Sequence, residues 1–219
     1  MIIKSRLSDE ELIQFICKAA YEYQKLLGKT YLIVGKNKES EYFWFQCSFE
    51  KKQFMHLLGI KSKSMQSDEF YEKCVDGEGI SISDCTPSRN HSRTTINEKA
   101  SCCADMLKIS DAKYMKVGIK DKISQYVDFK YAYGSNATLG FQVKDSGISF
   151  PITLIPRNID EFSSMKYKII FVFEKSGDGV LYDRPMMEIK KGLLEEKYDE
   201  LPEALKELVE NPICESSDS

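Results

Sequence analysis

The sequence has little of several features that would point directly to a function. Its 219 residues include only two histidines and one tryptophan, and 31 basic against 34 acidic residues leave a net charge of −3. This near balance excludes a surface that attracts nucleic acid as a whole, so any nucleic-acid site must be a local basic patch. No apolar run approaches the roughly 20 residues that span a bilayer, and we expect no membrane partner.

The cysteines and the first residues exclude further classes of protein. The seven cysteines are odd in number, Cys102 and Cys103 are adjacent, and no C-x-x-C pair occurs, which is unlike a disulfide framework or a zinc site. The N-terminus passes straight into a polar-capped helix and lacks the apolar segment of a signal peptide. We therefore expect a cytoplasmic protein with reduced thiols, no metal and no cofactor.

The first half of the sequence predicts helices around one hairpin. Ser8 and Glu11 have the spacing of a capping box, and apolar residues at helical intervals follow as far as Leu26. Two apolar or aromatic segments, 31–34 and 42–49, flank a polar turn and predict a β-hairpin. The other elements predicted here are helices over 50–58, 67–77 and 95–107, the last with a second capping box at Thr95 and Glu98, and a minor strand over 80–84.

The second half is rich in strands separated by turn residues such as Gly134-Ser135-Asn136 and Asp145-Ser146-Gly147. Because the connections are short, the pattern predicts an antiparallel sheet without parallel crossovers. The predicted elements are strands over 114–119, 127–133, 137–143, 149–155, 168–173 and 180–183, followed by amphipathic helices over 188–198 and 202–210.

Together these elements predict one α+β domain over residues 1–187, in which N-terminal helices precede a curved antiparallel sheet. The helices of residues 188–211 are expected to pack on this domain or on a partner, including a second copy in a homodimer. Residues 212–219 are polar and predict a disordered tail.

Four short segments, taken in their order along the chain, resemble a known nuclease family. They are Phe54-Met55-His56-Leu57-Leu58-Gly59-Ile60, Phe70-Tyr71-Glu72-Lys73, Lys120-Asp121-Lys122 followed by 137–141, and Phe150-Pro151-Ile152-Thr153-Leu154-Ile155. Their order is similar to that in the phage-associated fourth class of the barnase–EndoU–colicin–RelE-like nucleases. The resemblance covers about residues 30–175 and implies a barnase- or RelE-like fold. Where the family often has a small polar residue, this chain has Leu58.

The resemblance also implies an activity and a setting. It implies a ribonuclease effector from a phage, a mobile element or a bacterial defence or toxin locus, with RNA as substrate and an antitoxin or other protein as partner. Metal-independent RNA cleavage uses the 2′-hydroxyl as nucleophile and needs a general base, a general acid and cations for the phosphorane.

Five residues are candidates for these roles. His56 is the predicted general acid/base, because histidine titrates near neutral pH, and we expect it to open onto a basic hollow in the strand-rich half. Arg157 is the predicted phosphate clamp and Thr153 a supporting hydroxyl donor. Lys144 and Tyr133 are expected on one sheet face, as a cation and as a stacking platform for RNA.

A second candidate site is the polar loop before residue 95. It carries Arg89, His91 and Arg93 among several hydroxyl residues. It also precedes a helix N-terminus, where backbone amides favour anions. The loop therefore predicts a phosphate- or RNA-binding segment, and an ordinary solvated loop is the alternative.

Purely structural interpretations of these residues stay open. His56 lies between Phe54 and Leu57 and could be a packed structural histidine, Thr153 could serve strand packing, and Arg157 could simply be solvated. At the level of the chain, the alternative is a non-catalytic interaction module on the same fold. In such a module His56 would be buried and an apolar patch exposed.

A third hypothesis is a metal-dependent DNA nuclease. Asp183 with Glu188-Ile189-Lys190 superficially matches a D…E-x-K pattern. Pro185 argues against the paired strand that this pattern needs, and rescue of activity by Mg²⁺ or Mn²⁺ would reveal such an enzyme.

Overall fold

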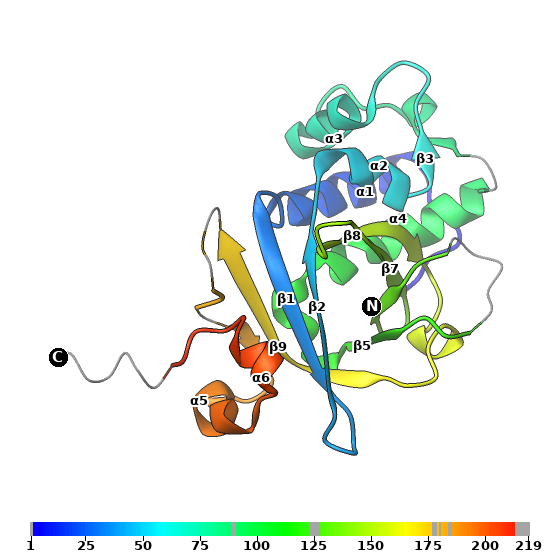
Figure 1. Ribbon diagram of the computed structural model, residues 1–219. Coiled ribbons are helices and arrows are strands. Elements are labelled where there is room, and N and C mark those ends of the chain that lie inside the picture. The colour runs from blue at the N-terminus through cyan, green and yellow to red at the C-terminus, as the bar shows by residue number, and fades with distance from the viewer. Residues whose placement is uncertain are drawn as a thin grey trace.

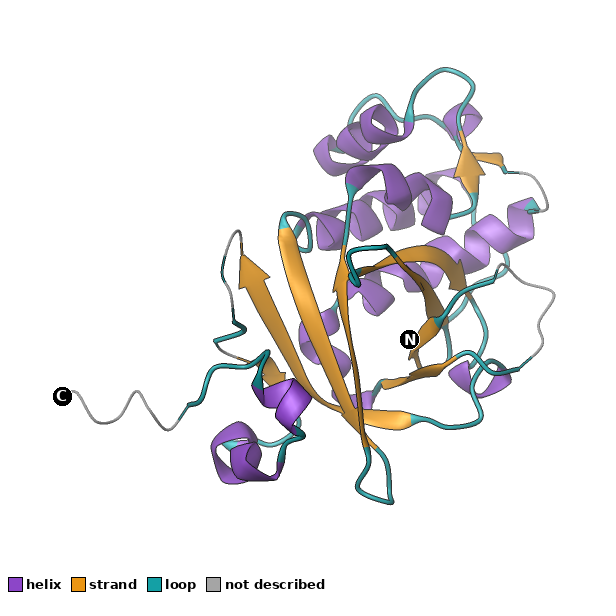
Figure 2. Cartoon of the chain, in the orientation of Figure 1, coloured by secondary structure: helices purple, strands orange, loops and turns teal. Residues whose placement is uncertain are grey.

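The computed structural model describes residues 2–88, 91–122, 128–176, 179, 181–183 and 185–212, and Figure 1 shows their arrangement. A strongly curved sheet occupies the middle of the molecule (Figure 2). The first four helices gather on one side of it, and the C-terminal helices lie against another side. The chain thus has the α+β fold that the sequence predicts. Within the described ranges, no helix has the length and apolar character needed to cross a membrane.

The helices follow the predicted order with differences at their ends. Ser8 caps the first helix, since its hydroxyl accepts from the Glu11 N–H at 3.1 Å and the Glu11 carboxylate accepts from the Ser8 N–H at 2.9 Å. The helix predicted from Thr95 begins at Arg93, because the Ser92 hydroxyl is its cap. The α-helices are α1 (Asp9–Gln24), α2 (Lys51–Leu57), α3 (Ser67–Asp76), α4 (Arg93–Leu107), α5 (Leu193–Lys197) and α6 (Glu203–Lys206).

The strands also match the predicted pattern over most of the chain. The segment predicted as a strand over 80–84 is instead a short 3₁₀ helix, η1 (Ile82–Asp84), and the segment 181–183 is not a strand. The strands are β1 (Lys29–Lys36), β2 (Tyr42–Ser48), β3 (Ile60–Lys61), β4 (Thr86–Pro87), β5 (Lys116–Ile119), β6 (Tyr131–Gly134), β7 (Thr138–Val143), β8 (Ser149–Ile155), β9 (Tyr167–Ser176) and β10 (Pro185–Glu188).

The main sheet closes on itself. Its order is β1-β2-β8-β7-β6-β5-β9-β10, and β9 also pairs with β1, so the strands from β1 to β9 form a barrel-like ring. The ring contains one parallel contact, between Cys47 of β2 and Ser149 of β8, which corrects the prediction of a purely antiparallel sheet. Three helices and several strands separate β2 from β8, so the chain has ample length for a parallel return there. The short-connection argument applies only to the later strands.

Aromatic rings fill the inside of this ring. Alternate residues of a strand point to the same face, and on β2 these are Phe43 and Phe45. The Phe45 ring lies 5.0 Å from that of Tyr131 and 5.2 Å from that of Phe141, and Phe43 stacks on Tyr167 at 5.3 Å between ring centroids. These contacts hold strands together that are distant in sequence.

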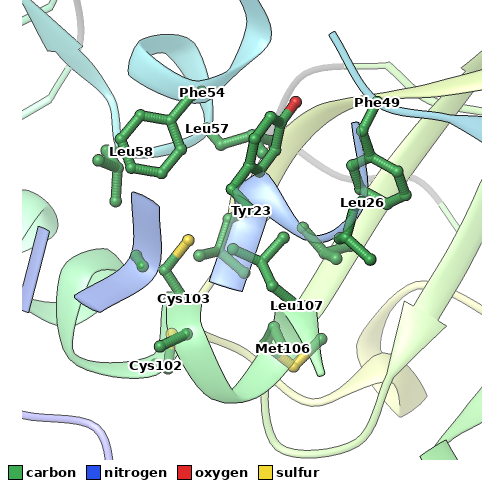
Figure 3. Packing of buried hydrophobic residues seen from close by; sticks show 14 of the residues in the cluster. Tyr23, Leu26, Phe49, Phe54, Leu57, Leu58, Cys102, Cys103, Met106 and Leu107 are labelled. Atoms are coloured by element: carbon green, nitrogen blue, oxygen red, sulfur yellow. The ribbon is translucent and has the colours of Figure 1, made fainter. Parts of the chain in front are cut away.

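The four N-terminal helices form a layer that shares one core with the sheet. Tyr23 of α1 lies at its centre, and its ring packs against Phe49 and Phe54 (Figure 3). The Tyr23 ring also packs against Tyr71. The Tyr23 hydroxyl donates to the Glu50 carbonyl at 2.9 Å, which ties α1 to the start of α2. Figure 3 shows α4 contributing Cys102, Cys103, Met106 and Leu107 to the same core.

The C-terminal helices cover the outer face of β1 and β9. Leu194, Tyr198, Leu201, Leu205 and Val209 pack there in a second apolar cluster, which also contains Leu32, Val34, Phe171 and Phe173. The helices are shorter than predicted, and the predicted helix from residue 188 begins at Leu193. Of that segment only Glu188 belongs to strand β10, which pairs with β9 despite Pro185, because β10 lies at the edge of the sheet.

Candidate active site

Both histidines of the chain lie within the electrostatic reach of one buried lysine. His56 belongs to α2, His91 to the loop before α4, and Lys99 to α4 itself. The Lys99 Nζ lies 3.3 Å from the His91 Nε2. Lys99 acts electrostatically on both imidazoles, and His56 acts on His91. We call these three residues the His56–His91–Lys99 cluster.

Helix α2 turns His56 outward because its other faces are buried. Phe54 and Leu57 are fully buried in the main core, and Met55 is 6% exposed. His56, by contrast, is exposed and lies in the last turn of the helix. The helix then ends at Gly59, whose φ of 70° favours glycine. The apolar neighbours that suggested a packed histidine therefore hold α2 in place and leave the His56 ring accessible.

Gly59 also sets the position of His91. A Cβ at residue 59 would lie 2.5 Å from the His91 Cδ2, so only glycine allows this approach. The Gly59 carbonyl accepts from the Ser88 N–H at 2.9 Å, and the Ser88 carbonyl accepts from the His91 N–H at 3.0 Å. Together with the pairing of β3 with β4, these bonds bring the His91 loop against the end of α2.

Lys99 is buried on the packed side of α4 and is only 3% exposed. Burial lowers the pKa of Lys99 from its ordinary value of 10.5 to about 8, although Cys103 and Cys102 act in the opposite direction. Below that pH the ammonium has only hydrogens to offer, so the His91 Nε2 must accept and the proton of a neutral His91 lies on Nδ1.

Both imidazoles are held in their neutral form. The main cause that lowers the pKa of His56 is partial desolvation of its ring, although the residue as a whole is exposed. The Lys99 charge lowers this pKa further. The same two causes, with His56 as a third, lower the pKa of His91. Since the ordinary value is 6.5, both rings are mainly neutral at pH 7 and can accept a proton.

The structure places Thr153 and Arg157 at different points of β8 and the turn after it. Leu154 belongs to the core shared with α4, so the alternating Thr153 points to the opposite face, beside Gly140 and Phe129. Arg157 is exposed at the end of the strand, and no carboxylate of a described residue forms an ion pair with it. The structure joins neither side chain to the His56–His91–Lys99 cluster by a hydrogen bond among the described residues, and Arg157 as a phosphate clamp stays a prediction.

Neither Tyr133 nor Lys144 is free for the role predicted for it, as stacking platform and as cation. Tyr133 of β6 is fully buried, so its ring cannot meet a base, which corrects that prediction. Lys144 pairs with the Glu50 carboxylate at the start of α2 and lies 5.3 Å above the Phe150 ring. The aromatic pattern of β6 is thus explained by packing of the core.

The three residues predicted to bind phosphate in the loop before α4 have different outcomes. His91 joins the cluster, while Arg93 pairs with Asp9 of α1 at 2.8 Å and so links α4 to α1. Arg89 lies outside the described residues.

Sequence reasoning missed Lys99, although a signal was present. On a helix, residue 99 lies on the same side as Ile96 and Cys103, which belong to the apolar face of α4. A lysine within an apolar face is unusual, because a buried charge is costly without a partner. That pattern predicts a functional lysine, and it lies far in the sequence from His56.

The acidic pattern near the C-terminus has a structural role. Glu188 ends β10, and its carboxylate accepts from the Gly192 and Leu194 N–H groups, both at 2.9 Å, which caps α5. Among the described residues, no group of three histidines, cysteines or acids is placed to hold a metal ion.

Comparison with known proteins identifies a family. The model of a family described as phage-Barnase-EndoU-ColicinE5/D-RelE like nuclease4 matches residues 15–189 of the chain. This range covers the ring of strands and the His56–His91–Lys99 cluster, and it ends before α5. No curated protein and no solved structure matches the chain significantly.

Replacing Lys99 with methionine tests its burial. We expect the free energy of unfolding of Lys99→Met to exceed that of the wild type by about 3 kcal/mol at neutral pH, because a neutral side chain removes the cost of burying a charge. The folded pKa lies below the unfolded one, so this cost is full below pH 8 and vanishes as the pH rises toward 10.5.

Denaturant unfolding at several pH values measures this difference. The exposed Lys18→Met is the control, and its stability should change by less than about 0.5 kcal/mol. A Lys99→Met variant less stable than the wild type at neutral pH would contradict the burial of a costly charge.

Gly59→Ala and Gly77→Ala form a matched pair. Both positions have a positive φ, of 70° and 73°, so both variants carry the same backbone strain. A Cβ at Gly77 meets nothing within 4 Å, whereas at Gly59 it meets the His91 ring. We expect Gly59→Ala to lower the free energy of unfolding by about 1–3 kcal/mol more than Gly77→Ala. Equal losses would show that residue 59 does not hold His91.

Proposed function

This chain belongs to the family of phage barnase-, EndoU-, colicin E5/D- and RelE-like nucleases, and we propose that it cleaves RNA by attack of a 2′-hydroxyl on the adjacent phosphate, without a metal ion. The observation that carries this proposal is that both histidines lie within the electrostatic reach of Lys99, which contacts His91. Cleavage by this route needs a base, an acid and a positive charge near the phosphate. The cluster supplies groups of these three kinds.

We assign the general base to His56. Its ring is exposed and mainly neutral at pH 7, so it can take the proton of a 2′-hydroxyl that approaches from solvent. The oxygen then attacks the phosphorus and forms a pentacovalent phosphorane. The Lys99 charge lies close enough to act on His56, so it also favours the negative charge that develops on this phosphorane.

We assign the general acid to the Lys99–His91 pair. In this proposal the His91 Nδ1–H gives its proton to the departing 5′-oxygen, while Lys99 replaces it with a proton on Nε2. The 3.3 Å contact supports this transfer, and so does the lowered pKa of Lys99, which makes the ammonium a usable acid. The products are a 2′,3′-cyclic phosphate and a 5′-hydroxyl. His56 keeps the abstracted proton, and Lys99 is left neutral until solvent restores both.

Arg157 and Thr153 differ in the roles that this proposal gives them. Arg157 is an exposed cation without an ion-pair partner among the described residues, so we keep it as a contact for a more distant phosphate. Thr153 faces another part of the sheet and receives no catalytic role. The setting as a toxin or defence effector, with an antitoxin partner, follows the family's phage association and stays a prediction.

A non-catalytic interaction module is the weaker alternative. That hypothesis requires a buried His56, and the residue is exposed. The large exposed apolar side chains of the described residues come from several separate segments of the chain: Ile2, Tyr21, Tyr114, Ile119, Met165 and Leu181. We therefore propose no second function.

Cleavage of total RNA in EDTA tests the activity and the assignment together. We expect the wild type to cut RNA without added metal, and His56→Gln and His91→Gln to lose about 10²–10⁴ in rate, because each removes a proton-transfer group. Circular dichroism shows whether the variants are folded, and a 5′-hydroxyl on the new end confirms the chemistry. An inactive wild type would count against ribonuclease activity. A histidine variant that cuts RNA at the wild-type rate would show only that this histidine is not needed for cleavage.

The pH dependence of kcat/KM follows from the same groups. His56 must be neutral, and its pKa lies below 6.5, so the rate should rise with pH only below that value. The acid pair must keep its proton, so the rate should fall above about pH 8, the pKa of Lys99. An ordinary lysine, with a pKa of about 10.4, would not produce this fall. Lys99→Met should lose the alkaline fall, and its persistence would contradict the role of Lys99.

A further inference from the structure

A hollow of about 370 Å³ lies at the same end of the helical layer as the cluster. Its volume is within the roughly 300–1,000 Å³ that small-ligand sites occupy. Cations and hydroxyls line one part of it, and two methionines line another. We call it the lysine–serine hollow; its main lining residues are Met55, Lys61, Ser62, Lys63, Ser64 and Met65.

The hollow is joined to the cluster through α2 and β3, which contact each other (Figure 1). Met55 directly precedes His56 on α2. Lys61 belongs to β3, and only Ile60 separates it from Gly59, the residue that touches His91. A strand of RNA placed at His56 therefore needs little length to reach the hollow.

The two lysines of the hollow are free to meet an anion. Lys61 and Lys63 are exposed, and neither forms an ion pair with a carboxylate of the described residues. Most acidic side chains nearby are already engaged: Glu69, which also lines the hollow, pairs with Lys73 at 3.1 Å. The hollow thus carries two lysines without an ion-pair partner among the described residues, in a chain whose net charge is −3.

Asp84 restrains the loop that carries Ser62 and Ser64. It is 9% exposed, and its carboxylate accepts from the Ser64 hydroxyl at 2.6 Å and from the Ser81 N–H at 3.0 Å. The hydrogen bond from Ser64 is the main cause that lowers the pKa of Asp84, so the carboxylate stays charged. The Ser62 hydroxyl in turn accepts from the Ser64 N–H at 3.2 Å. These hydrogen bonds restrain the loop, which reduces the entropy cost of binding.

We propose that the lysine–serine hollow binds a nucleotide of single-stranded RNA beyond the two nucleotides that flank the bond that is cut. Lys61 and Lys63 would contact its phosphate, and the flexible thioether of Met65 would receive the base, since sulfur packs well on aromatic rings. This inference rests on the proposed function for its placement beside His56. It makes the hollow a positioning and affinity site, with no part in the chemical step.

Binding of an RNA that cannot be cut separates the hollow from catalysis. The probe is a fluorescent 2′-O-methyl oligonucleotide of about ten nucleotides, which lacks the nucleophile but keeps the phosphates and bases. Fluorescence anisotropy at several salt concentrations compares wild type with Lys61→Gln/Lys63→Gln. The control, Lys38→Gln/Lys191→Gln, makes the same change of charge at two exposed lysines, in the β1–β2 turn and before α5.

We expect the hollow variant to bind about tenfold more weakly or worse. The slope of log K against log salt should also fall by about 1.4, because each of the two lysines neutralises one phosphate and each neutralised phosphate of a single strand contributes about 0.7. The control should bind as the wild type does. Equal binding by the hollow variant and the control, or no binding by the wild type, would overturn the inference.

Cleavage of a dinucleoside monophosphate, measured in parallel, tests the proposed catalytic function without the hollow. This substrate is too short to fill both sites, so the hollow variant should cut it at the wild-type rate, while His56→Gln should not. Weaker oligonucleotide binding by the hollow variant, without any cleavage by the wild type, would support the hollow and reject the catalytic proposal. Unequal cleavage of the short substrate by the hollow variant would reject its purely positioning role.

Discussion

The ammonium of Lys99 lies inside the helical layer, with the His91 Nε2 3.3 Å away as its acceptor. Burying a charge in this way costs stability, and the chain tolerates it only because α4 is packed on α1 and the sheet. Burial lowers the pKa of both imidazoles, and the Lys99 charge lowers it further. Lys99 therefore couples the two histidines electrostatically, while its own pKa is lowered by burial.

The fold brings this unit together from segments that are distant in the sequence. Tyr23 and the apolar face of α2 fix the end of that helix, and Gly59 lets the His91 loop approach it. The closed ring of strands supplies the surface on which α4 packs. By contrast, α5 and α6 cover the outer face of β1 and β9, beyond the range that the family model matches. The site thus belongs to the helical layer, and a hollow lies next to α2.

Local signals predicted much of the fold and less of the site. The capping box at Ser8, the glycines after α2 and α3, and the turn residues around β7 act over a few residues, and the elements they bound were found in place. The closure of β9 on β1 and the contact of Cys47 with Ser149 depend on long-range packing that no local pattern encodes. His56 and His91 were candidates separately, but only the tertiary structure joins them. Lys99 went unnoticed because its role depends on burial, and Tyr133 was misjudged for the same reason.

The most direct test of this account is a proton NMR titration of the two histidines in the wild type and in Lys99→Met. Their ring signals are the only imidazole signals of the chain, because it has two histidines. The account predicts that both pKa values lie below 6.5 in the wild type and that both rise when the lysine charge is removed. Values at or above 6.5 that do not respond to the substitution would contradict it.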